Sequence, residues 1–354
     1  MRGPSTDPEF GIRRKWGVQY VIRLDPWKSG IPGLAPPEIL VFLRIPKTAG
    51  TTIQAVFERC LPGANFRGEI RGSASALLVR PTSEIAKKFS RLPPEEQRAV
   101  RCFVDEHVAM DIATVFDKPV RFFTILREPV DRAISHFFHN RASAHLPCYP
   151  LIKDRTIEEY LDSGIGIDAD NHQVRILSGC ASLDCRWDLQ GRALSAAPVE
   201  RCHLELAKRN IEERFIVAAP MEQFSALVWF FKRLYNWPVH RAVFNIKNDS
   251  AASGRPKDVV SAATRNRLRQ MNQYDTELYE WVRERFAQQI RPLEPGFSRE
   301  VRRFEMLNAA AQKLHRAAPD PVRKLTSRLL HTCSPAGSRL NGINRPAETS
   351  GDND

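Results

Sequence analysis

A lysine, a glycine and several threonines lie together between an apolar run and an amphipathic run. The segment reads Arg44-Ile45-Pro46-Lys47-Thr48-Ala49-Gly50-Thr51-Thr52. Lysine supplies a point charge, glycine lets the backbone approach a ligand closely, and threonine hydroxyls donate hydrogen bonds. A helix that begins here adds free N–H groups and a positive dipole end. The segment therefore favours a phosphate or sulfate group on a nucleotide. The candidate binding residues are Arg44, Lys47, Thr48, Ala49, Gly50, Thr51 and Thr52.

The flanking runs supply the elements that would position this loop. Residues 39–43 are apolar and branched or aromatic, which is typical of a strand buried in a parallel sheet. After the loop, Ile53, Val56 and Phe57 have helical spacing. The loop is not a Walker A motif, because its lysine precedes the glycine. Taken alone, the segment is also compatible with a strand–helix turn that binds no phosphate.

A second strand and helix carry further candidate donors. Residues 122–126 form an apolar run that ends at Arg127, and Pro129 is placed where a helix can begin. Arg132 and Ser135 follow on that helix. Open α/β sheets bind ligands at the carboxyl ends of their strands, so we expect Arg127 and Ser135 to hold a second anion there.

The two segments resemble the 5′-phosphosulfate loop and the 3′-phosphate motif of sulfotransferases that use 3′-phosphoadenosine 5′-phosphosulfate (PAPS). The motifs P-K-T-A/G-x-T and R-[DE]-P-x-x-R-x-x-S are those of carbohydrate enzymes, and they are most similar to the heparan sulfate 2-O-sulfotransferase group with its bacterial relatives (sulfotransferase family 2). The resemblance covers residues 39–290. It implies an α/β fold with a P-loop-like central parallel sheet flanked by helices, the sulfotransferase fold.

The resemblance also implies roles for individual residues. Lys47 would be catalytic, by neutralising charge that grows on the transferred group, and Arg127 with Ser135 would hold the 3′-phosphate. His107 would be the general base, at the end of a short predicted strand, residues 102–104. A surface or core histidine is the alternative. The neighbouring Glu106 is a second candidate for the base, and we also assign it to the acceptor side.

A tract that runs from Asp168 to Leu177 reads as one helix and resembles the family's N-x-Q-x-R-x-L-x-G segment, which faces the acceptor. Asn171, Gln173 and Arg175 are therefore the further candidates for substrate binding. The alternative is a solvated helix face. No metal is implied. In relatives Cys180 and Cys185 correspond to a bridged pair, and whether they are bridged here is open.

The composition limits the class of protein. The 354 residues carry a formal net charge of +12, which suits polyanionic partners such as anionic glycans. No basic run with interleaved aromatic residues indicates nucleic-acid binding. No apolar run is long enough for a transmembrane helix. Residues 1–10 resemble a vector-encoded leader. We expect a cytoplasmic protein if the source is bacterial, and a Golgi-lumen protein if this is a truncated eukaryotic enzyme.

The chain divides into four expected parts: residues 1–36 as an N-terminal extension, 37–292 as the sulfotransferase domain, 293–332 as a C-terminal helical extension and 333–354 as a disordered tail. Within the domain we predict a strand over residues 215–219 and helices over residues 221–237 and 257–290.

The predicted activity is transfer of a sulfonate group from PAPS to a hydroxyl, on a carbohydrate or on a small molecule. Two alternatives remain. A kinase-like phosphotransferase would need carboxylates for magnesium, and Asp105, Glu106 and Glu128 are available. A non-catalytic module that binds anionic glycans would need only the basic surface.

Overall fold

A computed structural model describes residues 31, 33–61, 65–66, 82–104, 109–144, 146, 148–180, 197–244 and 260–317. Asp105, Glu106, His107 and Cys185 lie outside these ranges. The predictions made for them therefore stay predictions.

The described strands form one parallel sheet of five strands in the order β2-β3-β1-β4-β5. Their bounds are β1 Ile39–Phe42, β2 Asn65–Phe66, β3 Cys102–Val104, β4 Val120–Leu126 and β5 Phe215–Pro220. The predicted α/β class with a central parallel sheet is confirmed, and so are the strands predicted at residues 39–43, 102–104, 122–126 and 215–219, within a residue or two of their ends.

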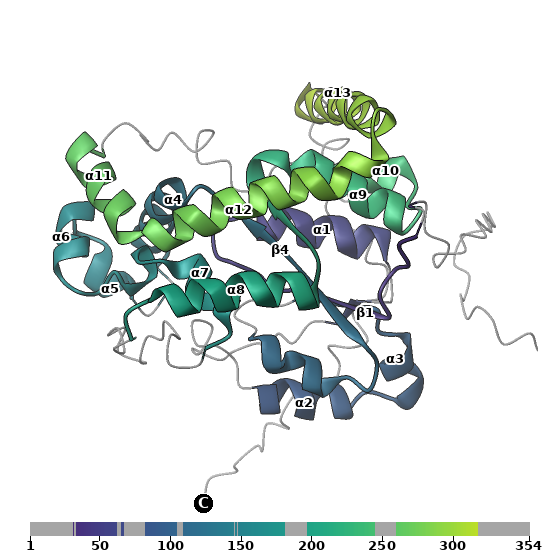
Figure 1. The fold of residues 1–354 in the computed structure, drawn as a ribbon, viewed down its shortest axis with the longest axis horizontal. Coiled ribbons are helices and arrows are strands. Elements are labelled where there is room, and N and C mark those ends of the chain that lie inside the picture. The colour runs from purple at the N-terminus through teal and green to yellow at the C-terminus, as the bar shows by residue number, and fades with distance from the viewer. Residues whose placement is uncertain are drawn as a thin grey trace, which may run out of the picture.

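Helices connect and cover these strands (Figure 1). The α-helices are α1 Gly50–Cys60, α2 Thr82–Ser90, α3 Pro94–Ala99, α4 Pro129–Ala142, α5 Tyr149–Ile152, α6 Ile157–Asp162, α7 His172–Ser178, α8 Arg201–Arg214, α9 Phe224–Leu234, α10 Val239–Ala242, α11 Ala262–Met271, α12 Gln273–Ile290 and α13 Gly296–Ala317. Short 3-10 turns are η1 Met110–Val115, η2 Ile167–Ala169, η4 Met221–Gln223 and η6 Arg291–Leu293. No described helix is both long and apolar enough to cross a bilayer.

Two of the predicted helices are interrupted. The tract that begins at Asp168 is split into η2 and α7 at Asn171, whose left-handed φ of 43° a continuous helix does not allow. The helical stretch up to residue 290 is likewise divided into α11 and α12 at Asn272. The two breaks contact each other, because Asn171 N–H donates to Asn272 Oδ1 at 3.0 Å.

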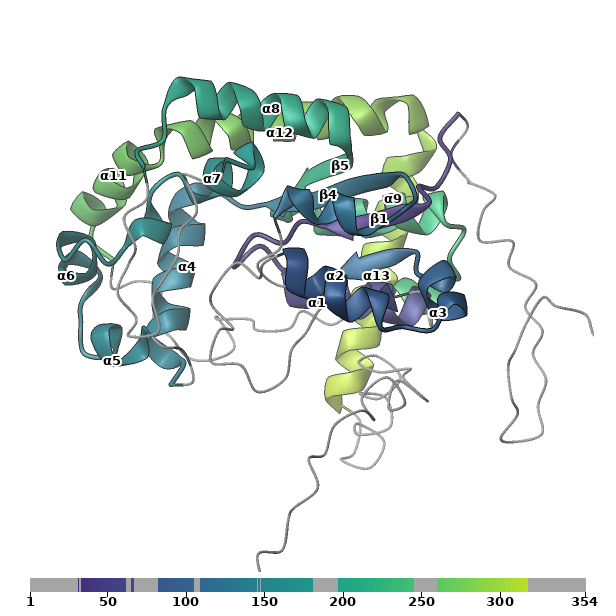
Figure 2. The same cartoon turned by 90° about the horizontal axis from the view of Figure 1, so that it is seen from below.

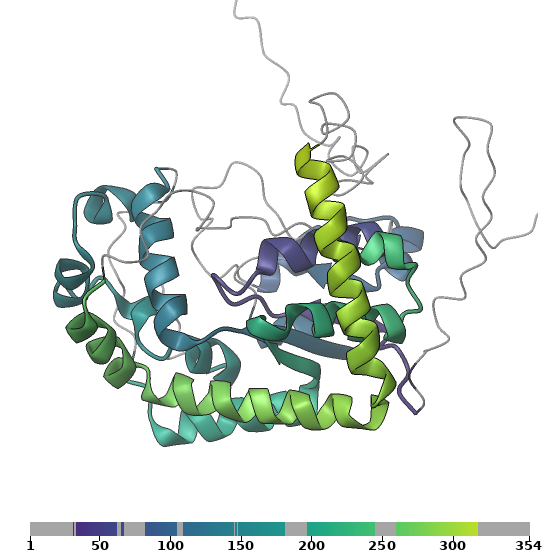
Figure 3. The same cartoon turned by 90° about the horizontal axis from the view of Figure 1, so that it is seen from above.

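The sheet is packed on both faces. Leu40 and Phe42 of β1 join a core cluster with α1, α9 and α13, whereas Ile39 and Val41 join a second cluster with α7, α8 and α12. This alternation is that of a strand buried on both sides. Figures 2 and 3 show α8 and α12 side by side on the second face. Helix α13, which lies within the predicted C-terminal extension, buries Phe297 and Phe304 in the first cluster.

A third apolar cluster lies outside the sheet. It joins α4, α5, α6 and α11, which lie together at the left of Figure 1. Because α4 follows β4 directly, this helical group is attached to the carboxyl edge of the sheet. The loop between β1 and α1 and the start of α4, which carry the two predicted motifs, therefore lie at the same edge of the sheet.

Candidate functional site

The loop between β1 and α1 has an unusual backbone. Lys47 has φ of 71° and Ala49 has φ of 64°, both in the left-handed region that non-glycine residues seldom adopt. Residues in such conformations cluster at ligand-binding turns, where successive N–H groups form a concave anion site. Ala49 gives α1 no side-chain cap. Among the described residues, no acceptor takes the N–H groups of Gly50 and Thr51. These groups remain available to an anion.

Arg44 lies over the first turn of α1. Its Nη2 donates to Thr51 Oγ1 at 3.1 Å, and its Nη1 donates to Gln54 Oε1 at 3.4 Å. A Cβ atom added to Gly50 would lie 2.6 Å from Arg44 Nε. The sequence predicts that glycine lets a ligand approach the backbone here. In the structure the group closest to Gly50 is the Arg44 side chain. Arg44 is in place to add positive charge at the helix start.

Thr48 differs from the other threonines of the loop. It is fully buried, and its hydroxyl donates to the Ile45 carbonyl oxygen at 2.8 Å. The single hydroxyl proton is therefore used inside the loop. Thr48 thus offers an anion its backbone N–H and not its hydroxyl. Thr51 is partly exposed on the first turn of α1.

The second motif begins α4 as the sequence indicates. Pro129 is the first helical residue, and the Glu128 side chain caps the helix by accepting from Asp131 N–H at 2.7 Å. This bond gives Glu128 a structural role. Ser135 lies farther along α4 and is partly exposed. Its predicted share in holding the 3′-phosphate stays a prediction.

Arg127 joins the two motifs. Its Nη1 donates to the Lys47 carbonyl oxygen at 3.3 Å, across 80 residues of sequence. Burial lowers the pKa of the Arg127 guanidinium, and the carboxylates of Asp131 and Glu222 act in the opposite direction. The group is partly buried and close to the loop. The structure therefore brings Arg127 and the strained Lys47 backbone together at one edge of the sheet, as the carboxyl-edge argument predicts.

The three residues of the acceptor tract bond to the protein itself. Gln173 is fully buried, and its amide pairs with the backbone of Arg127: Nε2 donates to the Arg127 carbonyl at 3.0 Å, and Oε1 accepts from Arg127 N–H at 3.0 Å. Arg175 bonds to Asp170 Oδ2 at 2.5 Å and to the Ala197 carbonyl at 2.7 Å. These bonds give both side chains a role inside the fold.

Asn171 is likewise occupied. Its Nδ2 donates to the Met271 carbonyl at 2.7 Å, and its Oδ1 accepts from the backbone N–H groups of Tyr274 and Asp275. Direct acceptor contact by Asn171, Gln173 and Arg175 stays a prediction. The observed bonds indicate that this tract joins the end of β4 to the α11–α12 junction and the start of α12.

A buried polar cluster below α4 could not be found from the sequence. Asp168, only 3% exposed, accepts from Tyr160 OH and lies 2.7 Å from His136 Nδ1. Its carbonyl accepts from Arg132, which is fully buried. Burial raises the pKa of Asp168, but His136 and the Tyr160 hydroxyl outweigh it and hold that pKa well below its usual range. Arg132, a candidate donor in the motif, therefore supports α4 from inside.

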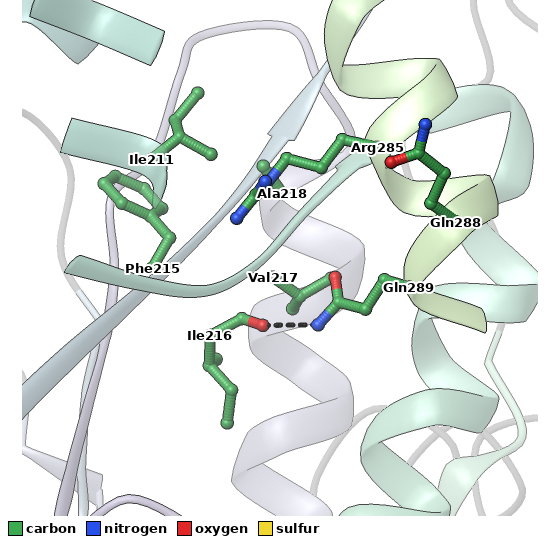
Figure 4. A pocket seen from close by; sticks show the side chains of 8 residues that line it. All are labelled: Ile211, Phe215, Ile216, Val217, Ala218, Arg285, Gln288 and Gln289. Atoms are coloured by element: carbon green, nitrogen blue, oxygen red, sulfur yellow. Dashed lines mark hydrogen bonds between the residues drawn. The ribbon is translucent and has the colours of Figure 1, made fainter. Parts of the chain in front are cut away.

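Within the ranges that the structure describes, no group of three or more His, Cys, Asp or Glu side chains is placed to bind a metal ion. A pocket lies between α8, β5 and the end of α12, lined by Ile211, Phe215 and Arg285 among others (Figure 4). It contains none of the predicted site residues.

Comparisons with known proteins match most of the chain. The galactose-3-O-sulfotransferase family matches residues 23–326. Heparan-sulfate 6-O-sulfotransferase 2 of Danio rerio is 25% identical over 304 residues, which cover 76% of this chain and 61% of that protein. Heparan-sulfate 6-O-sulfotransferase 1 is 26% identical over 327 residues in Homo sapiens, with 80% of this chain and 73% of that protein covered. The match thus spans about three fifths of the length of the zebrafish relative.

Proposed function

This chain belongs to the galactose-3-O-sulfotransferase family, and from that premise we propose that it transfers a sulfonate group from PAPS to a hydroxyl of an anionic glycan. The family match confirms the resemblance to carbohydrate sulfotransferases. The motifs were most similar to a 2-O-sulfotransferase, whereas the relatives reported above are 6-O-sulfotransferases. The 2-O assignment is therefore not carried into the proposal.

One observation supports the proposed donor above all others. The Arg127 guanidinium donates to the Lys47 carbonyl, so the residue predicted to hold a 3′-phosphate lies against the loop predicted to hold a 5′-phosphosulfate. A nucleotide with anionic groups at both positions would satisfy both motifs at once. An ATP-type nucleotide carries no 3′-phosphate and would leave Arg127 without its partner.

The residues present fit this donor. The left-handed backbone at Lys47 and Ala49, and the N–H groups of Gly50 and Thr51, suit the 5′-phosphosulfate end. PAPS, when bound, supplies an activated sulfonate on a good leaving group. Lys47 would neutralise negative charge that grows during transfer, and the first turn of α1 would hold the phosphate oxygens in place.

We propose His107 as the group that removes the acceptor proton. It follows β3, which lies beside β1, and the last residue of β3 is in register with Phe42 just before the phosphate loop. The residues that follow β3 therefore begin at the same edge of the sheet as the loop that follows β1. A neutral imidazole with an ordinary pKa near 6.5 suits proton removal close to neutral pH. Glu106 is the alternative base.

The acceptor is proposed to be a sugar hydroxyl on an acidic polysaccharide. The relatives' names specify the 6-O position of heparan sulfate, and the family's name specifies the 3-O position of galactose. The net charge of +12 favours a polyanionic acceptor over a neutral one. A small-molecule hydroxyl is the second candidate.

The test is transfer of ³⁵S from labelled PAPS to heparan sulfate, to galactose-terminated oligosaccharides and to small alcohols. We expect label in a polysaccharide, without added magnesium and with a chelator present. Label transferred from γ-labelled ATP, and only with magnesium, would support a kinase. Tight glycan binding with no transfer from either donor would support a binding module.

The compartment is also a proposal. Cytoplasm remains the expectation for a bacterial source and the Golgi lumen for a eukaryotic one, and the relatives reported above come from animals. Fractionation of the source cells with an antibody to this chain would decide between them.

A further inference from the structure

The backbone of Arg127 lies just beyond the end of the pairing between β4 and β5. The last β4 residue in register with β5 is Leu126, opposite Pro220. The next residue, Arg127, still has an N–H and a carbonyl that need partners in a partly buried setting. The amide of Gln173 supplies both, at 3.0 Å each. One side chain thus takes the place of a strand.

Gln173 is itself held from behind. Its backbone N–H donates to Asp275 Oδ2 at 3.0 Å, and the N–H of Val174 donates to Asp275 Oδ1 at 2.8 Å. Asp275 is fully buried on α12. The backbone of Gln173 is therefore fixed by a helix of the main fold, and its side chain, which carries the amide, is fully buried.

On its other side, Arg127 reaches the phosphate loop through the 3.3 Å bond from Nη1 to the Lys47 carbonyl. Bonds therefore run without interruption from Asp275 through Gln173 and Arg127 to Lys47. Loss of the Gln173 amide would leave the Arg127 backbone unpaired, and rotation of that peptide towards new partners would turn the guanidinium away from the loop.

We propose that Gln173 is a positioning residue that makes the site selective for 3′-phosphorylated nucleotides by fixing the direction of the Arg127 guanidinium. The proposal rests on the proposed function, in which Arg127 binds the 3′-phosphate. In this role Gln173 does not need to contact the acceptor.

Calorimetry on the full chain tests it, with adenosine 3′,5′-bisphosphate and 5′-AMP as probes. In Gln173→Leu we expect the preference for the bisphosphate to fall at least about tenfold, because its affinity drops while that of 5′-AMP is nearly unchanged. Gln289→Leu is the matched control. Gln289 Nε2 also donates to a backbone carbonyl, that of Ile216 at 2.7 Å, far from the site in sequence (Figure 4).

The outcomes separate the two claims. Equal affinity of the wild-type chain for the two probes would contradict the proposed function itself. A selective wild type whose Gln173→Leu variant keeps its full preference would overturn only the positioning role, as would a raised acceptor KM with unchanged nucleotide selectivity. If Gln173→Leu does not fold, Gln173→Glu replaces it. Glutamate keeps the acceptor for Arg127 N–H and loses the donor to its carbonyl, so the same fall in preference is expected.

Discussion

Asn171, at the start of α7, caps α12, and Asp275, on α12, caps α7. Asn171 Oδ1 accepts from the N–H groups of Tyr274 and Asp275 in the first turn of α12, and the Asp275 carboxylate accepts from Gln173 and Val174 in the first turn of α7. Each helix start is thus satisfied by a side chain from the other. The starts of α7 and α12 are thus held together, and Gln173, which pairs with the backbone of Arg127, lies on α7.

This arrangement predicts a pH dependence. Burial raises the pKa of Asp275 from its ordinary 3.8 to about 6, although Arg132 and two backbone N–H bonds favour the charged form. The folded protein therefore binds more protons than the unfolded chain between these values. The contribution of Asp275 to the free energy of unfolding falls as pH rises from about 4 to about 6 and is constant above.

Thermal melts between pH 4 and pH 7 measure this contribution. Asp275→Asn removes the titrating group, so the stability of the wild type relative to this variant should increase as the pH is lowered through that range. Asp117→Asn, at an exposed position, is the control and should follow the wild type. A wild-type curve parallel to that of Asp275→Asn would show that Asp275 does not titrate there.

Replacement of Arg127 by alanine should remove recognition of the 3′-phosphate. A charge-assisted hydrogen bond contributes about 1.5–3 kcal/mol, so the Kd for adenosine 3′,5′-bisphosphate should rise roughly 10- to 150-fold. The Kd for 5′-AMP should change little. Calorimetry provides both values, and Arg267→Ala, which removes an ion pair with Asp162 instead, should change neither. Parallel losses for the two nucleotides would mean that Arg127 holds the loop and not the 3′-phosphate.

Replacement of Lys47 should act on turnover. In the proposed role, the lysine charge neutralises negative charge that grows during transfer, so Lys47→Ala should lower kcat more than it weakens donor binding. Alanine has a Cβ atom as lysine does, so the strain of the left-handed φ of 71° at this position is the same in the variant. Initial rates at saturating PAPS test this. A variant with normal kcat and only a raised KM would make Lys47 a binding charge alone.

The general base can be identified by two variants. His107→Ala should lose roughly 10²–10⁴-fold in kcat while still binding adenosine 3′,5′-bisphosphate, because proton removal and not nucleotide binding is affected. Glu106→Gln should lose much less. The pH–rate profile of the wild type should show a group near pH 6.5 that must be deprotonated. If His107→Ala kept normal kcat and Glu106→Gln were inactive, Glu106 would be the general base.

A double-mutant cycle tests the contact between Gly50 and Arg44. In Gly50→Ala the new methyl group would meet Arg44 Nε at 2.6 Å, so Arg44 must give up its bond to Thr51. We expect a loss of about 1 kcal/mol in the free energy of unfolding from urea titration. In an Arg44→Ala background the same substitution should have no cost. An equal cost in both backgrounds would show that something other than Arg44 requires glycine.

The sequence was sufficient for four of the five described strands, with the short β2 missed, and for the position of the two motifs that are proposed to bind anions. Strands buried on both faces read as apolar runs, and in a parallel sheet the residues that follow such runs share one edge, so Lys47 and Arg127 could be expected to lie near each other. Pro129 marks the start of α4 because proline is suited to the first helical position.

The interior of the site was beyond sequence reasoning. Arg127 and Arg132 are the same residue type in one motif, yet only tertiary packing decides that Arg132 is buried against Asp168. The break at Asn171 was hidden because its polar side chain fits an amphipathic pattern, and its partners on α12 are more than a hundred residues away. Local periodicity carries no information on such pairs.

The mutual capping of α7 and α12 also has a consequence for the order in which a nascent chain matures. β1, the loop before α1, β4 and Arg127 are synthesised first, and Asp275 leaves the ribosome 148 residues after Arg127. Until then the backbone N–H groups of Gln173 and Val174 at the start of α7 lack their acceptor. If Gln173 positions Arg127 as proposed, translation that stops before α12 should give a chain that has both proposed anion motifs and lacks nucleotide selectivity, which would then be acquired late in synthesis.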